Sequence, residues 1–493
     1  MNKERIMGEI SPFNYGHFIE HFHRQIYGGI YNPQNVLADK EGFRTDVIEA
    51  MKKIKVSILR WPGGCFVSSY HWKDAVGSKR TPLFDKAWRV EEPNTFGTDE
   101  YIQMCRKIGC EPYICTNAGT GTAEEMSDWV EYCNLENEGQ YAKRRINNGY
   151  KEPHNVKYWS IGNENYGWWE IGAKSAEEWG RIVLESAKMI KHVSPTTELT
   201  AAALSDLDWN INLLKHSGKF LDWISIHKYW DELQNVNNIA TYEESMAYTA
   251  NIDKEISEVR GLLIAMGLEK KIKIAFDEWN LRGWYHPNVH TIKQGIDKVD
   301  YIEPRNENDD NSIYTMTDAV FTACVLNMLN RNCDIVGMAN FAPVVNTRGC
   351  IYTHDNGIVL RSTYHIFDLY VNYLGNEMID SFSSENVHSK FANKEGRKVE
   401  VDTLDIIATY KADENLTALA IVNKAIEESI TLEVNITGFD AKEFRVITVN
   451  GDSTESYNDV DHTEVYLREG AWSKLGKASF EIAAHSVNVI QFK

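Results

Sequence analysis

The sequence predicts a (β/α)8 TIM barrel followed by an antiparallel β-sandwich with a jelly-roll-like pattern. Eight short β-rich runs alternate with helix-like stretches as far as Asn340, and this alternation is typical of a parallel barrel. Helical periodicity stops near Leu374, where period-two patterns replace it. The alternative is an open, doubly wound sheet, but no Gly-rich phosphate-binding turn follows the first run.

The composition is that of a large globular protein with an acidic surface. The 493 residues include 52 basic and 71 acidic side chains, which gives a formal net charge of −19. A nucleic-acid-binding surface needs a basic stripe, so this balance argues against a nucleic-acid partner. With 43% hydrophobic and 25% charged residues, the chain can bury a large core, and extensive disorder is excluded.

The predicted barrel strands are short, apolar and followed by polar residues. They are residues 14–20, 56–60, 112–117, 157–161, 199–204, 222–227, 273–277 and 334–340. Between them, apolar residues recur at helical spacing. The clearest predicted helices are residues 43–53, 98–108, 175–192, 241–266 and 313–331.

The C-terminal region shows the alternation expected of strands with one buried face. Ile430, Leu432, Val434 and Ile436 lie on one such face, and residues 464–467 and 486–492 are further strand candidates. We therefore divide the chain into three parts. Residues 1–12 form an N-terminal strand that could join the sandwich, residues 13–373 form the catalytic barrel, and residues 374–493 form the sandwich.

The sequence shows no sign of export or membrane insertion. Residues 1–13 lack the apolar core of a signal peptide, and no run approaches the ~20 apolar residues of a membrane helix. The eight cysteines show no CxxC motif and no zinc-type spacing, so we expect free thiols and no metal. We expect a cytoplasmic protein without a membrane partner.

Two carboxylates are placed at predicted strand ends, where barrel enzymes carry their catalytic groups. Glu164 follows the fourth strand and Glu278 the seventh, and both have Trp or Ile close by in the sequence. Two carboxylates that face each other across a barrel mouth are what cleavage of a glycosidic bond requires. The alternative is that both are salt-bridged plugs of the barrel.

The neighbours of the two carboxylates suggest different roles. Arg60 and Tyr229 are expected beside Glu278, where their donors would keep it ionised for attack on a sugar. Glu164 is then the group that must be protonated at neutral pH to donate to the leaving oxygen. Attack by Glu278 itself predicts carboxyl groups ~5 Å apart, whereas activation of a water molecule would need ~6.5–9.5 Å.

The two signatures Asn163-Glu164 and Asp277-Glu278-Trp279-Asn280 resemble the acid/base and nucleophile motifs of clan A retaining glycosidases. Within that clan the chain resembles glycoside hydrolase family 51, the α-L-arabinofuranosidases. The matching segments span nearly the whole barrel: residues 15–21, 24–29, 60–66, 70–74, 88–97, 149–154, 224–229 and 276–280. The C-terminal region resembles that family's sandwich by position and pattern.

The resemblance implies a retaining, exo-acting enzyme that removes terminal arabinofuranosyl residues from small carbohydrates without any cofactor or metal. It implies Glu164 as the acid/base and Glu278 as the nucleophile. It places Glu20, Arg60, Asn163, His227 and Tyr229 in the subsite that binds the furanose, with Cys65 lining it and Trp88 narrowing it. It also implies a homo-oligomer, commonly a hexamer in that family.

The segment after the eighth predicted strand departs from the family pattern. It reads Ala339-Asn-Phe-Ala342-Pro343-Val-Val-Asn346, and Pro343 stands where a sugar-binding Gln is expected. Proline has no side-chain donor, so a sugar hydroxyl needs another partner, for which Asn340 and Asn346 are the candidates. The departure leaves open a retaining β-xylosidase or endo-β-glucanase. A decayed, non-catalytic carbohydrate-binding barrel is a further alternative, against which both glutamates count.

The 14 tryptophans are concentrated in the barrel, and we interpret them as the lining of the sugar site. For four of them the sequence favours neither of two roles, stacking on a sugar or packing in the core: Trp168, Trp169, Trp230 and Trp284. Those at or after predicted strand ends are Trp61, Trp72, Trp88, Trp168, Trp169, Trp230, Trp279 and Trp284.

Two polar groups of residues are expected to have no catalytic role. We interpret His21, His23 and His71 as ordinary hydrogen-bonded histidines, because they lack metal-ligand spacing. We interpret Asp309 and Asp310 as part of a solvated, charge-rich loop that could form a lid.

Overall fold

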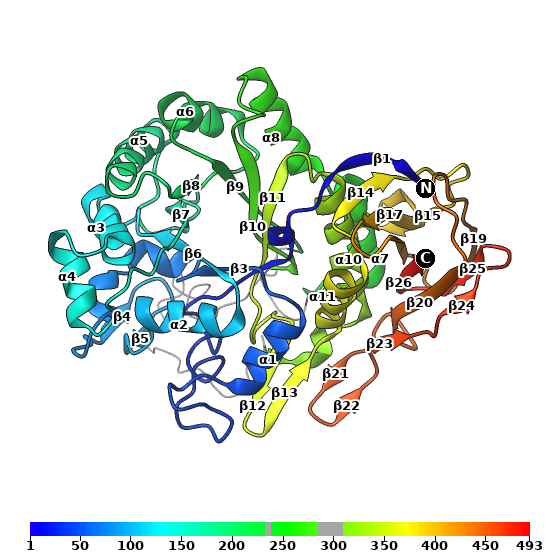
Figure 1. Cartoon of the computed structure of the whole chain (residues 1–493), viewed down its shortest axis with the longest axis horizontal. Helices are drawn as coiled ribbons and strands as arrows, with labels where there is room; N and C mark the ends of the chain where they lie inside the picture. Colours follow the sequence, from blue (N-terminus) through cyan, green and yellow to red (C-terminus); the bar gives the residue numbers. More distant parts are fainter. Residues whose placement is uncertain (232–237, 284–308) are drawn as a thin grey trace.

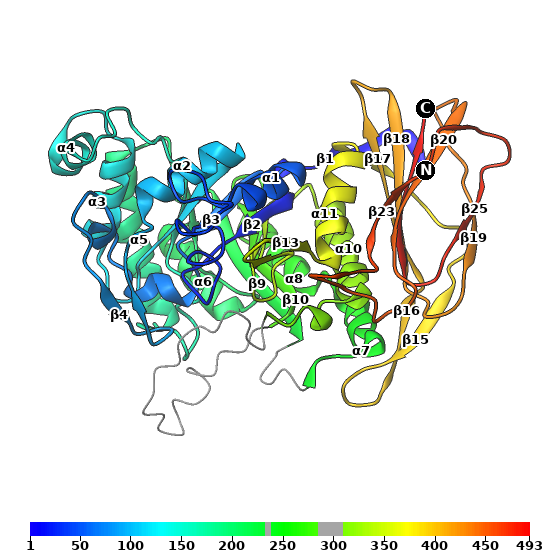
Figure 2. The same ribbon diagram turned by 90° about the horizontal axis from the view of Figure 1, so that it is seen from below.

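The computed structural model describes residues 1–231, 238–283 and 309–493. A barrel and a β-rich region lie side by side, the barrel at the left and centre of Figure 1 and the β-rich region at the right. The turned view shows helices α10 (Met316–Arg331) and α11 (Ser362–Tyr373) between the two (Figure 2).

The predicted barrel is confirmed. Eight parallel strands follow the order β8-β7-β6-β3-β2-β11-β10-β9, and a parallel bridge between Ala202 and Ser225 joins the two ends of this row. Because helices cover the outside, the strands are buried on both faces, which explains their continuous apolar runs. The strands are β2 (Gly16–Phe18), β3 (Ile58–Trp61), β6 (Glu111–Thr116), β7 (Tyr158–Ile161), β8 (Glu198–Ala201), β9 (Trp223–Asp231), β10 (Lys273–Arg282) and β11 (Val336–Phe341).

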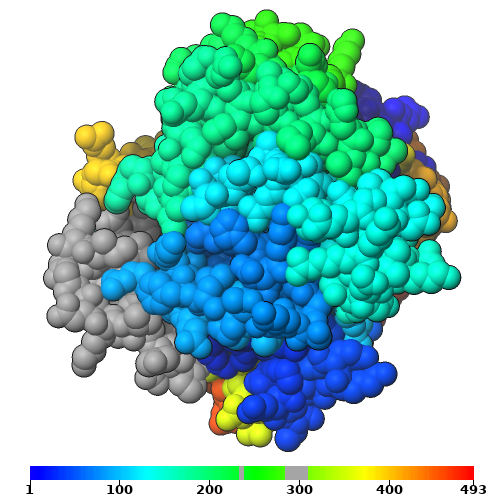
Figure 3. Space-filling model, turned by 90° about the vertical axis from the view of Figure 1, so that its left-hand side faces the viewer, coloured from blue at the N-terminus to red at the C-terminus, as the bar shows by residue number. Residues whose placement is uncertain are grey.

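Some helices on the outside of the barrel begin at side-chain caps, among them α3, α5, α6 and α7. At α5, for example, Ser175 accepts from the backbone of Glu178, and the Glu178 side chain caps the helix in return. Helices from the first half of the chain cover the barrel face that points away from the sandwich (Figure 3). The remaining helices are α1 (Thr45–Lys53), α2 (Thr98–Ile108), α3 (Ala123–Asn134), α4 (Gly139–Asn147), α5 (Ala176–Val193), α6 (Leu207–Ser217), α7 (Tyr242–Ala247) and α8 (Lys254–Ala265).

The single helix predicted at residues 241–266 is wrong. The segment forms α7 and α8, which are separated by a 3-10 turn at Tyr248–Asn251. Within this turn the Thr249 hydroxyl donates to the Met246 carbonyl and accepts from Lys424 of the β-rich region. A hydroxyl that bonds the local backbone competes with the helix, and apolar periodicity cannot register that competition.

The β-rich region contains an antiparallel sheet with the order β1-β14-β17-β18-β26-β20-β23. The first strand, β1 (Asn2–Glu9), pairs with β14 (Glu377–Asp380) and so brings the N-terminus into this sheet. A second layer, β19 (Ile430–Glu433) paired with β25 (Ser479–Ile482), packs on it through Phe480 and Phe492. The other strands of the main sheet are β17 (Leu404–Lys411), β18 (Leu416–Asn423), β20 (Glu443–Asn450), β23 (Tyr466–Glu469), β24 (Ser473–Lys474) and β26 (Ser486–Phe492).

The predicted C-terminal strands are matched to different degrees. The predicted run 486–492 coincides with β26. The predicted run 464–467 overlaps β23, which begins two residues later, at Tyr466. Val434 and Ile436 lie beyond the end of β19, although both pack against the sandwich core.

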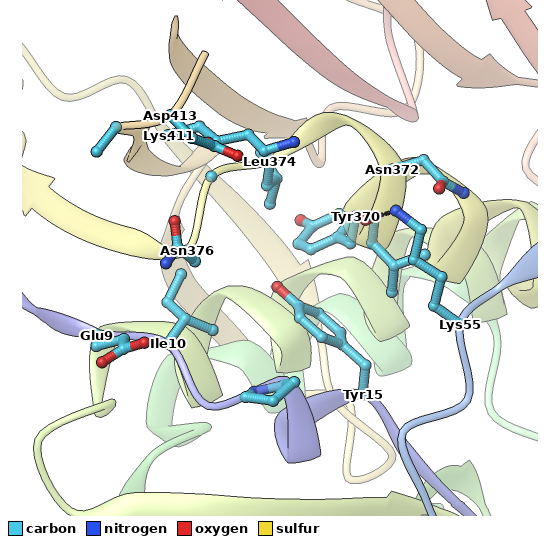
Figure 4. A pocket seen from close by; sticks show the side chains of 14 residues that line it. Glu9, Ile10, Tyr15, Lys55, Tyr370, Asn372, Leu374, Asn376, Lys411 and Asp413 are labelled. Carbon is cyan, nitrogen blue, oxygen red and sulfur yellow. Dashed lines mark hydrogen bonds between the residues drawn. The ribbon is translucent and has the colours of Figure 1, made fainter. Parts of the chain in front are cut away.

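A cleft of about 560 Å³ lies where the base of the barrel meets the β-rich region. Tyr15 and Lys55 approach it from the barrel side, and Lys411 and Asp413 of the β-rich region lie across from Tyr15 (Figure 4). Tyr15 and Lys55 precede β2 and β3, so the cleft is at the N-terminal end of the strands. That end of a barrel contributes to stability rather than to chemistry.

All eight cysteines are free thiols, as predicted. Among the residues described, no helix is both long and apolar enough to cross a membrane.

Candidate active site

The two candidate carboxylates come together at the opposite, C-terminal end of the barrel. Glu164 follows β7, and Glu278 lies within β10, which extends past the predicted end at residue 277. The pairing of β10 with β9 shifts register between Ala275 and Glu278. A bulge of this kind re-aims side chains, and here Asp277 and Glu278 both contact Arg60 inside the barrel.

The distance between the carboxylates is short. An oxygen of Glu164, an oxygen of Glu278 and a ring nitrogen of His227 all lie within 4.8 Å of one another. This agrees with the ~5 Å expected when one carboxylate attacks directly, and it is below the ~6.5–9.5 Å needed to fit a water molecule between carboxylate and sugar.

Glu278 is held by the two donors that the sequence predicted. Arg60 Nη1 donates to Oε2 at 2.7 Å, and Tyr229 Oη donates to Oε1 at 2.6 Å. Arg60 Nη2 also donates to Asn163 Oδ1 at 2.7 Å, so one guanidinium fixes both the carboxylate and the amide. Both oxygens of Glu278 are thus engaged by donors, which fixes the orientation of this carboxylate.

Glu164 occupies a strained backbone position. Its φ of +42° lies in the left-handed region, which costs a non-glycine residue about 1–3 kcal/mol. The side chain is fixed from two sides, because Trp169 Nε1 lies 2.9 Å from Oε2 and His227 Nδ1 lies 2.9 Å from Oε1. The strain is therefore balanced by contacts that aim this carboxyl group into the mouth.

The protonation state of Glu164 differs from the sequence-based expectation. Burial raises the pKa of Glu164, but the hydrogen bond and charge of His227 outweigh this and leave it below its ordinary value. Burial lowers the pKa of His227, yet the charge of Glu278 and bonds to Asp277 and Glu164 raise it to about 10. At neutral pH the proton therefore resides on His227, one hydrogen bond away from Glu164.

Glu20 and Trp88 form one wall of the site. Glu20 Oε1 accepts from the backbone of Phe66 at 3.0 Å and from Trp88 Nε1 at 3.1 Å. Burial and the nearby Glu278 charge raise the pKa of Glu20 to about 8. Trp88 is 2% exposed, so it supports Glu20 from behind. Gly63 is required here, because a Cβ on it would stand 2.3 Å from Glu20 Cγ.

Sequence reasoning missed Glu170. An oxygen of its carboxyl group lies within 4.8 Å of both Cys65 Sγ and a Glu164 oxygen, and Oε2 accepts from Asn163 Nδ2 at 3.3 Å. Burial, with the Glu164 charge as a further contribution, raises the pKa of Glu170 to about 8. The only sequence signal was a glutamate six residues after Glu164, in a loop where surface exposure is the usual interpretation.

Replacing Glu170 is expected to change how stability depends on pH. A carboxyl group with a folded pKa of about 8 keeps its proton while the unfolded chain loses it, so stability falls from about pH 4.5 to pH 8. Glu170→Gln removes this contribution, about 1.4 kcal/mol per pH unit at most. Urea unfolding at pH 5 and pH 8.5 measures the effect. The free energy of unfolding should decrease less between these two pH values in the variant than in the wild type.

The exposed glutamate Glu185, which pairs with Lys188, supplies the matched control. The free energy of unfolding of Glu185→Gln should decrease between pH 5 and pH 8.5 by as much as that of the wild type. Equal pH dependence of Glu170→Gln and the wild type would show that Glu170 is ionised at neutral pH, contrary to this description.

Two further candidates are engaged elsewhere. Asn340 Nδ2 donates to the His17 carbonyl at 2.7 Å, and Asn346 Nδ2 donates to the Arg24 carbonyl and to Thr353 Oγ1. Both asparagines are fully buried. Neither of the side-chain nitrogens proposed to compensate for Pro343 is therefore presented to the mouth.

The interpretation of the tryptophans as a sugar lining is largely wrong. Trp61, Trp72 and Trp279 are completely buried in the core, and Trp230 stacks on Phe276. Trp168 and Trp169 are the exposed exceptions, at 78% and 46%. Trp284 lies outside the described residues. Strand ends of a large barrel need aromatic packing beneath their loops, and this need produces the same sequence pattern as a sugar site.

The predicted histidine role is confirmed for two of the three residues. His21 Nδ1 pairs with Glu92, and His71 Nδ1 pairs with Glu125. The solvated position expected for Asp309 is wrong, because its side chain is fully buried and accepts from the Thr347 backbone at 2.7 Å.

Within residues 1–231, 238–283 and 309–493, two groups have ligand atoms close enough for a metal ion. They are Cys65 with Glu164 and Glu170, and Glu164 with His227 and Glu278. Metal ligands must be deprotonated. The raised pKa values of His227, about 10, and Glu170, about 8, place protons on these groups at neutral pH. The arrangement is suited to moving protons.

Comparison with known proteins agrees with this geometry. Residues 50–247 match the profile of the α-L-arabinofuranosidase 1 domain, and residues 277–486 match that of the α-L-arabinofuranosidase C-terminal domain. An intracellular exo-α-(1→5)-L-arabinofuranosidase of Halalkalibacterium halodurans is 32% identical over 89% of this chain and 87% of its own.

Solved structures give the same result. An α-L-arabinofuranosidase from Thermotoga maritima, in complex with arabinose, has a TM-score of 0.88 and 35% identity over 99% of this chain and 98% of its own. A GH51 α-L-arabinofuranosidase from Thermotoga petrophila has a TM-score of 0.83 and 34% identity, and the match covers 100% of this chain and 99% of its own. The chain therefore belongs to the α-L-arabinofuranosidases of glycoside hydrolase family 51.

Proposed function

We propose that this chain is a retaining, exo-acting α-L-arabinofuranosidase that removes terminal arabinofuranosyl residues from arabino-oligosaccharides or arabinoxylan fragments. The observation that carries the proposal is the pair of carboxylates, Glu164 and Glu278, with oxygens within 4.8 Å of each other at the barrel mouth. The name of the Halalkalibacterium halodurans relative supports exo action. Glu164 and Glu278 are the catalytic residues of this proposal.

The reaction proceeds in two displacements. A carboxylate oxygen of Glu278 forms a bond to the anomeric carbon as the bond from that carbon to the leaving oxygen breaks. Glu164 gives its proton to that oxygen. Glu164 then removes a proton from a water molecule, whose oxygen attacks the anomeric carbon and releases Glu278. Each displacement inverts the carbon, so the configuration is retained.

His227 supplies the proton for the first displacement. Its Nδ1 lies 2.9 Å from Glu164 Oε1, and its raised pKa of about 10 keeps the proton available at neutral pH. A bound sugar replaces water around Glu164 and so favours the neutral carboxylic acid. The shift of one proton along this hydrogen bond then gives the acid that the leaving oxygen needs.

The sugar is held by groups that already line the mouth. Arg60 and Asn163 form a hydrogen-bonded pair beside Glu278, and Glu20 packs against Gly63 and Gly64. Tyr229 and Cys65 complete the subsite. Beyond it, Trp168 and Trp169 expose their rings next to Glu164, where they can stack on the leaving sugar.

We also propose a cytoplasmic location, which the name of the intracellular Halalkalibacterium halodurans relative supports. Assembly into a hexamer, which the family resemblance implies, stays a prediction that analytical ultracentrifugation would test.

A substrate profile tests the proposed function against its alternatives. Aryl α-L-arabinofuranoside should be hydrolysed at least ~100-fold faster, by kcat/KM, than aryl β-D-xylopyranoside or β-D-glucopyranoside, because the fixed polar groups reject misplaced hydroxyls. Faster hydrolysis of the xylopyranoside, or internal cleavage of a glucan, would instead support the alternative that Pro343 leaves open, a retaining β-xylosidase or endo-β-glucanase. Binding without hydrolysis of any of the three would indicate a non-catalytic barrel.

A further inference from the structure

We propose that Arg348 is a positioning residue for the nucleophile and acts on it through Tyr229. The inference rests on the proposed function and extends it to the loop after β11, where Pro343 replaces the expected polar side chain. Arg348 Nη2 donates to Tyr229 Oη at 3.0 Å, and Tyr229 Oη donates to Glu278 Oε1 at 2.6 Å. The three residues form a directed chain from a cation to the nucleophile.

The direction of this chain follows from the chemistry of its members. A guanidinium can only donate, so the Tyr229 oxygen accepts from Arg348, and its own hydrogen is left to point at Glu278. A hydroxyl that accepts a charged donor becomes a stronger donor itself. Arg348 thereby fixes the rotation of the Tyr229 hydroxyl and strengthens its bond to the carboxylate.

The guanidinium is placed inside the site. Arg348 is 6% exposed, and its guanidinium carbon lies 4.9 Å from the centre of the Tyr229 ring. Burial raises the pKa of Glu20, and the charge of Arg348 acts in the opposite direction. Loop 342–350 thus brings a cation into the mouth, whereas Asn340 and Asn346 bond to backbone carbonyls.

The backbone of this loop is fixed, which a positioning residue requires. Asn280, two residues after the nucleophile, donates through Nδ2 to the Ala342 and Arg348 carbonyls at 3.0 and 3.2 Å. The buried Arg361 donates to the Thr347 and Gly349 carbonyls on either side of Arg348. The nucleophile strand and the cation loop are therefore one hydrogen-bonded unit.

Other charged and titratable groups also face Glu278, and they limit how much the removal of Arg348 alone can affect it. Arg60 comes from β3, His227 and Tyr229 from β9, Glu164 from the loop after β7, and Glu20 from the chain after β2. Removing Arg348 leaves Arg60 as the direct cation partner. The expected effect is therefore partial, and it depends on Tyr229.

The test is a double-mutant cycle with Arg348→Met and Tyr229→Phe, assayed on aryl α-L-arabinofuranoside. Arg348→Met keeps the apolar stem and should lower kcat ~10-fold with little change in KM, because one cooperative hydrogen bond to the nucleophile is weakened. The acid limb of kcat/KM should move to higher pH by ~0.5 unit or more, since a nearby cation favours the ionised carboxylate. In the Tyr229→Phe background, Arg348→Met should lower kcat by less than ~3-fold.

Two further variants keep the outcome decisive. Arg348→Lys retains the charge without the planar fork and should recover part of the lost kcat. Arg260→Met removes a guanidinium that pairs with Asp334, which precedes β11 at the other end of the strand, and should leave kcat and the pH profile unchanged.

Equal losses from Arg348→Met with and without Tyr229, or an unmoved acid limb, would overturn the inference. If Arg348→Met unfolds, as judged by thermal melting, the same cycle is run with Arg348→Lys, and the same independence from Tyr229 would overturn it. A wild-type protein without arabinofuranosidase activity would instead refute the proposed function and is distinguished by the unmutated control.

Discussion

Glu278→Gln is expected to lose activity on aryl α-L-arabinofuranosides by ~10⁴-fold or more in kcat. The amide keeps the size of the side chain, but its single carbonyl oxygen can accept from only one of the two donors, Arg60 and Tyr229. It also cannot form the covalent bond to the anomeric carbon. The loss should be similar for good and poor leaving groups, because nucleophilic attack is required for both. Initial rates with a series of aryl leaving groups measure it.

The truncated variant Glu278→Gly gives a stereochemical check. The space left by the side chain admits azide, which should restore part of the activity on an activated substrate and yield the azide of inverted, β configuration. A product of retained configuration would show that another group performs the attack. Glu243→Gln, at a partly exposed glutamate that pairs with Lys398 of the sandwich, is the control and should match the wild type.

Glu164→Ala is expected to discriminate strongly between leaving groups. The variant lacks the proton donor, so kcat/KM for a poor leaving group such as phenol should fall ~10³-fold, within the range of general acid catalysis. An activated dinitrophenyl substrate needs no protonation and should lose less than ~10-fold in kcat/KM. A plot of log kcat/KM against leaving-group pKa measures the difference.

The second displacement gives an independent check on Glu164. Without a general base, the glycosyl-enzyme of Glu164→Ala should be released slowly by water and rapidly by azide, with the α-configured azide as product. Uniform loss for all leaving groups, or an azide product of β configuration, would assign the acid/base role to another residue. Glu170, which approaches both Glu164 and Cys65, would be the next candidate.

Much of the barrel could be predicted from local patterns because its strands are buried on both faces. All eight predicted runs overlap observed strands, and residues 98–108 form a helix as predicted. The errors occur where side chains interact with the backbone or with distant strands. Thr249 interrupts a helix that apolar spacing alone would continue, and β10 extends to Arg282 through contacts with β9.

The site could be predicted only where a residue is attached to a strand end. Glu278, Arg60 and Tyr229 were assigned as neighbours because their strands fix them, and they are in contact. Glu170 and Arg348 lie in loops. Asn163 and Asn280 belong to recognisable motifs, but their contacts with these two loop residues follow no local sequence pattern. The buried Trp61 and Trp279 carry the same strand-end signal as the exposed Trp169, so position in the sequence could not separate them.

The protonation of Glu164 shows what three-dimensional proximity adds. The sequence indicates a neutral acid at Glu164, whereas His227, whose Nδ1 lies 2.9 Å from Glu164 Oε1, carries the proton at neutral pH because its pKa is raised to about 10. His227 is on β9 and Glu164 follows β7, so only barrel closure brings the pair together. The proton donor role of Glu164 stays a prediction, and the structure adds His227 as the protonated neighbour of this carboxylate.

Peptide mapping of the trapped glycosyl-enzyme tests the central claim most directly. Glu164→Ala should accumulate the intermediate when mixed with an activated aryl α-L-arabinofuranoside, because its hydrolysis lacks a base. Mass spectrometry of the digested protein should then find one pentosyl unit on the peptide that contains Glu278, with fragmentation placing it on that side chain. A pentosyl unit on another residue such as Glu20, or rapid formation of β-arabinose without any covalent intermediate, would contradict the account.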